Sequence, residues 1–131
     1  MYMLDTNICI YIIKKKTDGI LEQVKKKRKN GLYISSITLA ELEFGNANSI
    51  YRERNTLALM EFLTILGIHY FDENAAREYG ILKKDLKDRG CLIGSFDMLI
   101  GAHAKALQMT LVTNNTKEFK RIPGLSIENW V

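Results

Sequence analysis

The sequence predicts an α/β layer sandwich with a mainly parallel central sheet. Two observations support this class: short apolar segments alternate with longer helical patterns, and acidic or polar residues directly follow several of the apolar segments. In open sheets of this kind, ligands bind outside the carboxyl ends of the strands. The 131 residues suit one domain, and 47% apolar with 26% charged residues is an ordinary globular balance.

Strands are expected over 2–4, 32–35, 68–71, 110–113 and 125–129. Helices are expected over 7–15, 18–30, from Ser36 or Thr38 to about 46, over 52–66, 73–89 and 96–108, with a helical turn at 118–121. Gly31 ends the second helix, and Asp72 and Ser95 act as N-caps. The 52–66 helix carries apolar residues that fit a core face at least as well as an interface: Leu57, Leu59, Met60, Phe62, Leu63 and Leu66.

Several protein classes are poorly supported. The two cysteines, Cys9 and Cys91, form no CxxC motif, so we interpret them as buried thiols in a reducing cytoplasm. The two histidines, His69 and His103, lie far apart in the sequence, which disfavours a zinc site or a Ser-His-Asp triad. We find no apolar run near the ~20 residues that span a bilayer and no signal peptide. A cytoplasmic location is therefore expected.

Basic residues concentrate near the N-terminus. Between Lys14 and Lys29, eight basic residues stand against two acidic ones, a local charge of +6 in a chain whose total is +4. Such a run is often only a solvated helix face. The alternative is a surface that binds a polyanion such as RNA, because phosphates are contacted mainly by clustered Lys and Arg. The candidate RNA-binding residues are Lys14, Lys15, Lys16, Lys25, Lys26, Lys27 and Arg28.

Acidic residues from separate segments fall at strand ends or early in helices. Asp5 follows the first strand, Glu41 lies in the helix after the second, and Asp97 lies in a first helical turn. Asn115 follows the strand 110–113, with Glu118 three residues later. Because carboxyl ends of parallel strands share one sheet edge, these side chains are expected to meet there.

Each acid also has a purely structural explanation. Asp5 can be an N-cap, and Asp97 can interact with a helix dipole for about 0.3–1 kcal/mol. Glu41 is harder to explain, because it lies in a largely apolar helix where an unpaired carboxylate is costly. Taken together, three carboxylates at one edge repel each other and require a counter-charge.

A hard divalent cation provides that counter-charge. Mg²⁺ prefers oxygen ligands and uses few carboxylates. Asn115 can add a neutral oxygen, while Thr6, Asn7 and Thr113 can orient ligands or water. Such a site activates water and offsets charge on a phosphodiester. Beside a basic surface, this chemistry favours hydrolysis of a nucleic acid.

The segments LDTN (4–7), SSITLAELEFG (35–45), IGSFDMLIGAHA (93–104) and LVTNNTKEF (111–119) together resemble the PIN-domain ribonucleases, and most closely the VapC toxins of bacterial type II toxin–antitoxin pairs. The resemblance covers essentially the whole chain and implies one PIN domain over 1–131. It implies a PIN-like three-layer α/β/α sandwich and an endoribonuclease dependent on Mg²⁺ or Mn²⁺. Asp5, Glu41 and Asp97 match the first three acids of the family, as catalytic residues and metal ligands.

The resemblance has further implications and one departure. It implies a VapB-type antitoxin that covers the site, a homodimer, and a location in the bacterial cytoplasm. The variant with LDTNICIY and a terminal ENW resembles VapC toxins specific for initiator tRNA(fMet), cut in the anticodon stem-loop, which inhibits translation. The family often has a fourth acid where this chain has Asn115. Either a single metal ion is then enough for activity, or Glu118 takes the place of the fourth acid through a bridging water molecule.

Two alternatives stay open beside the nuclease. The first is a module that binds RNA or a partner without cleavage, and Asn115 in place of an acid is the feature that supports it. The second is a receiver-like signalling domain, which also gathers acids at strand ends. A receiver needs two adjacent early acids and an Asp ending its third strand, and the segment LYIS offers no such Asp.

Overall fold

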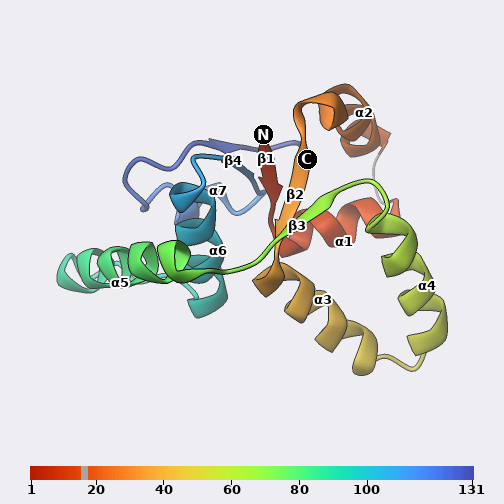
Figure 1. Ribbon diagram of the computed structural model, residues 1–131, viewed down its shortest axis with the longest axis horizontal. Coiled ribbons are helices and arrows are strands. Elements are labelled where there is room, and N and C mark those ends of the chain that lie inside the picture. Colours follow the sequence, from red (N-terminus) through yellow and green to blue (C-terminus); the bar gives the residue numbers. More distant parts are fainter. Residues whose placement is uncertain (16–17) are drawn as a thin grey trace.

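The computed structural model describes residues 1–15 and 18–131. Within that part of the chain, parallel strands form one five-stranded sheet in the order β3-β2-β1-β4-β5 (Figure 1). The strands are β1 (Tyr2–Leu4), β2 (Leu32–Ser35), β3 (Gly67–His69), β4 (Thr110–Val112) and β5 (Ile127–Glu128). The chain first adds β2 and β3 on one side of β1, then returns to add β4 on the other. The switch point of the topology therefore lies between β1 and β4.

Successive strand residues point to opposite faces, so each face of the sheet has its own core. Leu4 and Val112 belong to one cluster of buried residues, whereas Met3 and Leu111 belong to the other. Helices cover both faces, which produces the expected three-layer α/β/α sandwich (Figure 1).

The first face is covered by α1 (Thr6–Lys14), α2 (Asp18–Lys27), α3 (Ser36–Ala47) and α4 (Arg52–Phe62). A 3₁₀ turn, η1 (Arg28–Asn30), connects α2 to β2. Gly31, at φ 87°, ends this turn, as the sequence predicts. On α4, Leu59 and Phe62 are buried, while Leu57 and Met60 are more than half exposed. The expectation that the apolar residues of this helix form a core face therefore holds for only some of them.

The second face is covered by α5 (Glu73–Asp88), α6 (Ser95–Ala106) and the short α7 (Thr116–Phe119). Helices α5 and α6 pack closely together, and α6 also meets the α7 segment. At Gly101 of α6, an added Cβ would lie only 2.5 Å from Cδ1 of Ile122. The absent side chain at this position allows the close approach.

Element boundaries differ from the sequence expectations at several ends. The N-cap of α6 is Gly94, and Ser95 lies inside the helix, so the prediction of a Ser95 cap is wrong. Both residue types occur at N-caps, and the sequence pattern does not separate adjacent candidates. Helix α4 ends at Phe62 instead of 66, because the chain must turn into β3, where Gly67 lies against the Tyr33 ring. The helical turn predicted at 118–121 begins earlier, at Thr116.

The C-terminal segment closes the sheet. Strand β5 pairs with β4, and Trp130 is 7% exposed with its ring 5.2 Å from that of Tyr2. The Trp130 indole N–H donates to Oε1 of Glu128 at 3.0 Å. On the same Tyr2 ring, the ammonium of Lys27 lies 5.4 Å from the centroid. The Trp130 ring therefore ties the C-terminal segment to the first strand.

Among the described residues, none of the helices combines the length and the apolar character that a membrane crossing requires.

The difference in burial between two leucines predicts that truncating them to Ala lowers the free energy of unfolding by unequal amounts. Leu86 on α5 is 0% exposed and Leu57 on α4 is 66% exposed. Leu86→Ala is expected to reduce the free energy of unfolding by about 2–5 kcal/mol, because it removes buried contacts and leaves a cavity. Leu57→Ala is expected to change it by less than about 0.5 kcal/mol. Urea unfolding of both variants measures the difference, and equal costs would contradict the assignment of the two faces.

Candidate active site

Asp5 lies at the switch point, directly after β1. It is the N-cap of α1, where Oδ1 accepts a hydrogen bond from the backbone N–H of Ile8 at 2.9 Å. Its other oxygen, Oδ2, accepts a short hydrogen bond from the hydroxyl of Thr113, which follows β4. The side chain is 4% exposed. The two oxygens are therefore fixed by the first turn of α1 and by the residue that follows β4.

Glu41 reaches the same edge from α3. The hydroxyl of Thr6 donates to Oε1 of Glu41 at 2.6 Å, and it also lies 3.4 Å from Oγ1 of Thr38. Thr6 is the first residue of α1, next to Asp5, so this contact joins the starts of α1 and α3. The sequence predicted a supporting role for Thr6, and the structure shows it holding Glu41. Asn7 contributes its backbone N–H to Asp5.

Asp97 and Glu118 are joined by the carboxamide of Asn115. Its Nδ2 donates to Oδ2 of Asp97 at 3.4 Å and to Oε2 of Glu118 at 3.2 Å. The Asn115 backbone N–H donates to the Thr113 hydroxyl at 2.9 Å. Asn115 therefore acts here as a donor between two carboxylates, and Glu118 brings a fourth acid to the edge.

The electrostatics of Asp97 show that the acids influence one another. Its pKa is raised to about 6, first by burial, and then by the charges of Asp5, Glu118 and Glu41, while the Asn115 hydrogen bond lowers it. The pKa of Asp5 is also raised, mainly by burial and against the lowering effect of its hydrogen bonds. The carboxylates are thus close enough to repel, which favours protonation or a bound cation.

The donor set suits a hard cation better than a soft one. Carboxylate and amide oxygens are the ligands of Mg²⁺ and Mn²⁺. Burial raises the pKa of the Cys9 thiol well above its usual value, so this neighbouring sulfur stays protonated. Within residues 1–15 and 18–131, no group of three or more His, Cys, Asp or Glu side chains lies close enough together to hold a metal ion as the side chains stand.

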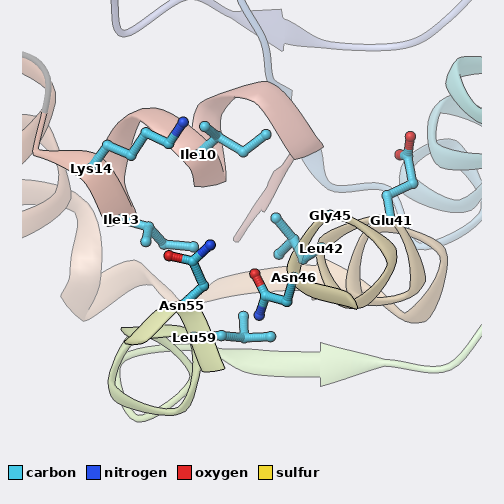
Figure 2. Close-up of a pocket in the computed structure, with 9 residues that line it drawn as sticks. All are labelled: Ile10, Ile13, Lys14, Glu41, Leu42, Gly45, Asn46, Asn55 and Leu59. Carbon is cyan, nitrogen blue, oxygen red and sulfur yellow. The ribbon is translucent and has the colours of Figure 1, made fainter. Parts of the chain in front are cut away.

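A cleft opens beside Glu41, between α1, α3 and α4 (Figure 2). Its volume is about 180 Å³, and its walls are mostly aliphatic. Asn46 and Asn55 point into it from α3 and α4, and Nδ2 of Asn46 has no hydrogen-bond partner in the described chain. Lys14 lies on the α1 side. The full lining is Ile10, Ile13, Lys14, Glu41, Leu42, Gly45, Asn46, Asn55 and Leu59.

The predicted RNA-binding residues do not form one surface at the acids. Lys14 lines the same cleft as Glu41 but from the opposite side, and Lys15 caps the end of α1. The residues from Lys25 to Arg28 lie at the opposite, starting edge of the sheet, where the backbone N–H of Tyr2 donates to Gly31 at 3.0 Å (Figure 1). Lys16 lies outside the described residues. An RNA-binding role for these residues stays a prediction.

Two buried hydroxyls near the acids were missed at the sequence level. Thr38 is 0% exposed and lies three residues before Glu41, a spacing that places both on one helix face. That spacing was the available signal. Ser35 is also 0% exposed and caps α3, but its contact to His103 spans 68 residues and left no local signal.

Comparisons with known proteins agree with this geometry. The family model described as PIN domain matches residues 2–125. Ribonuclease VapC2 of Rickettsia felis is 47% identical over 99% of this chain and 98% of its own length. The tRNA(fMet)-specific endonuclease VapC of Salmonella typhimurium is 40% identical over 98% and 97%.

Solved structures show the same similarity. The VapBC2 complex of Rickettsia felis, bound to a DNA fragment from its promoter, contains a chain with a TM-score of 0.95 at 46% identity. The alignment covers 99% of this chain and 98% of that one. The expectation from the sequence motifs is confirmed: the chain belongs to the PIN-domain family and, within it, to the VapC ribonucleases.

Proposed function

We propose that this chain is the toxin of a type II toxin–antitoxin pair and an endoribonuclease that uses Mg²⁺ or Mn²⁺. The observation that carries the proposal is the convergence of Asp5, Glu41 and Asp97 at the switch point of a PIN-domain sheet. PIN-domain nucleases are generally dependent on divalent metals. The oxygen donor set of this site fits that requirement.

The residues of the site have distinct roles in this proposal. A bound divalent cation supplies an activated water and offsets the charge of the phosphodiester. Asp5 is the most constrained ligand, because Thr113 and the Ile8 N–H hold its two oxygens. Thr6 orients Glu41. Asp97, whose pKa is raised first by burial and then by the charges of the neighbouring acids, would hold a cation in its deprotonated form.

We propose initiator tRNA(fMet), cut in the anticodon stem-loop, as the substrate. The support is the name and 40% identity of the Salmonella typhimurium relative. Lys14, which lines the same cleft as Glu41 from the α1 side, is the candidate for contact with a substrate phosphate. The cluster from Lys25 to Arg28 lies at the far edge of the sheet, so it would contact a more distant part of an RNA as large as a tRNA.

We propose a VapB-type antitoxin as the partner, because three similar solved structures are VapBC complexes. The cleft between α1, α3 and α4 offers aliphatic walls, two carboxamides and continuity with Glu41 (Figure 2). These features suit a peptide segment that inserts apolar side chains and directs an Arg or Lys toward the acids.

A binding module without cleavage is the second candidate. The Asn115 amide bridging Asp97 and Glu118 supports it, because an amide carries no charge for a second metal ion. The two functions separate in one assay: a module binds tRNA tightly but yields no products in any divalent metal.

Asp5→Asn is expected to lower the cleavage rate at least 100-fold while the protein stays folded. Asn keeps the N-cap function, and removing one of several close carboxylates relieves repulsion. The measurement is cleavage of a tRNA pool in Mg²⁺ or Mn²⁺, with circular dichroism for the fold. Glu73→Gln, on the exposed first turn of α5, is the control. Activity that persists in excess EDTA would contradict the proposal.

The raised pKa of Asp97 predicts that, without metal, the free energy of unfolding depends on pH. Its pKa rises from 3.8 unfolded to about 6 folded, so the fold favours the neutral form. Metal-free wild type is therefore expected to lose stability relative to Asp97→Asn as the pH rises from about 4 to 6, with a plateau above. Because the carboxyl is partly exposed, the difference should be of the order of 1 kcal/mol. Urea unfolding with EDTA measures it. Adding Mg²⁺ at pH 7.5 should reverse the order of the two proteins.

Gly45→Gln is expected to weaken antitoxin binding at least tenfold. Gly45 lines the cleft, and an added Cβ would meet nothing within 4 Å, so the longer side chain obstructs the cleft without straining the helix. Gly80→Gln on α5 is the matched control, with an equally open site outside the cleft. Titration calorimetry with the small protein encoded beside this gene measures both. Equal affinities for the two variants would contradict docking in the cleft, provided that both retain RNA cleavage.

A further inference from the structure

His103 is a buried imidazole that the proposed chemistry does not use. It lies on α6, six residues after Asp97, and is 1% exposed. Burying a polar ring costs free energy unless its nitrogens are paired. The partners of this ring are therefore informative.

The first partner is at the start of α3. Nδ1 of His103 lies 2.8 Å from Oγ of Ser35, which is 0% exposed. Ser35 ends β2 and caps α3, and its Oγ accepts from the backbone N–H of Ile37 at 3.0 Å. Ser35 thus connects the imidazole directly to the first turn of the helix that carries Thr38 and Glu41.

The second set of partners follows β3. The ring hydrogen-bonds to the backbone of Tyr70 and packs edge-on against Phe71, with centroids 5.4 Å apart. The Phe71 N–H donates to Oγ of Ser36 at 3.0 Å. Burial and the neighbouring His69 lower the pKa of His103, so the ring is neutral near pH 7. A neutral ring that donates to the Tyr70 backbone from Nε2 accepts at Nδ1 from the Ser35 hydroxyl.

These contacts join the two helices whose acids repel each other. Helix α6 carries Asp97 and α3 carries Glu41, and the charge of Glu41 contributes to the raised pKa of Asp97. Glu41 lies six residues after Ser35, just as His103 lies six residues after Asp97. The contact between His103 and Ser35 therefore lies about 9 Å along α6 from Asp97 and about 9 Å along α3 from Glu41. At that distance it can fix how the two helices cross without entering the acidic site.

We propose that His103 is a positioning residue, which through Ser35 sets the separation of Glu41 and Asp97 and thereby the affinity of the site for a divalent cation. The proposal rests on the metal-binding part of the proposed function, and it adds a role for two residues outside the acidic cluster. The imidazole supplies a rigid, neutral link where a charged pair would add to the field of the acids.

Mn²⁺ affinity, measured by calorimetry and electron paramagnetic resonance without RNA, tests the proposal. Ser35→Ala and His103→Leu are each expected to weaken Mn²⁺ binding about 10-fold, the usual lower range for residues that orient metal ligands. Ser35→Thr keeps the hydroxyl and should restore most of the affinity. Because the two residues act as one unit, the double variant should lose no more than either single variant.

Val24→Ala is the control for general destabilisation, because this buried residue lies on α2, which packs mainly against α1 and η1 rather than against α3 or α6. Its Mn²⁺ affinity should stay within twofold of wild type at a temperature where all variants are folded. Unchanged affinity in Ser35→Ala and His103→Leu, or fully additive losses, would overturn the proposal. If His103→Leu fails to fold, His103→Gln and Ser35→Ala provide the same comparison.

A crystal structure of Ser35→Ala separates this inference from the proposed function. The inference predicts a shift of α3 relative to α6 and a lengthened contact between Thr6 and Glu41, whether or not the protein binds metal. Superposition with wild type within coordinate error would overturn it. Wild type that binds no Mn²⁺ would contradict the proposed function instead, and the crystallographic comparison would still decide the geometry.

Discussion

The structure depends on placing several carboxylates at one sheet edge although they repel. Asp5 shows how the chain manages this: its two oxygens accept hydrogen bonds from the Ile8 N–H and the Thr113 hydroxyl. Those bonds favour the charged form and partly offset the burial that raises its pKa. The same carboxylate caps α1 and joins β1 to β4. Structural and chemical roles therefore coincide in one side chain, and removing the charge need not remove the cap.

Around Asp5, each acid is steadied by a neutral donor instead of a cationic side chain. Thr6 donates to Glu41, and Asn115 donates to both Asp97 and Glu118. Arg or Lys in these positions would neutralise the acids and compete with a metal ion. Hydroxyl and amide donors orient the oxygens and leave most of the negative charge available.

The sequence was most informative where a residue's role depends on its neighbours in the chain. Asp5 and Asp72 were recognisable as caps, and the short apolar segment over 2–4 was enough to place a strand. The gathering of acids followed from the parallel-sheet rule. The family resemblance gave the rest of the site. What could not be predicted depends on contacts across the fold: the choice of Thr6 as partner of Glu41, and the contact between Ser35 and His103. The distribution of the basic residues over two edges of the sheet could not be predicted either. It arises because α2 turns back toward the start of the sheet.

The position of β4 beside β1 has a consequence for the order in which the chain is made. The contact from Asp5 to Thr113 joins residues 108 positions apart, and Asn115 and Glu118 come later still. Strand β4 also needs β5 to cover its other edge. A chain emerging from the ribosome therefore exposes Asp5 early but cannot assemble the acidic edge until β4 and β5 are free to fold. While the segments before β4 are being made, the acidic edge therefore does not yet exist.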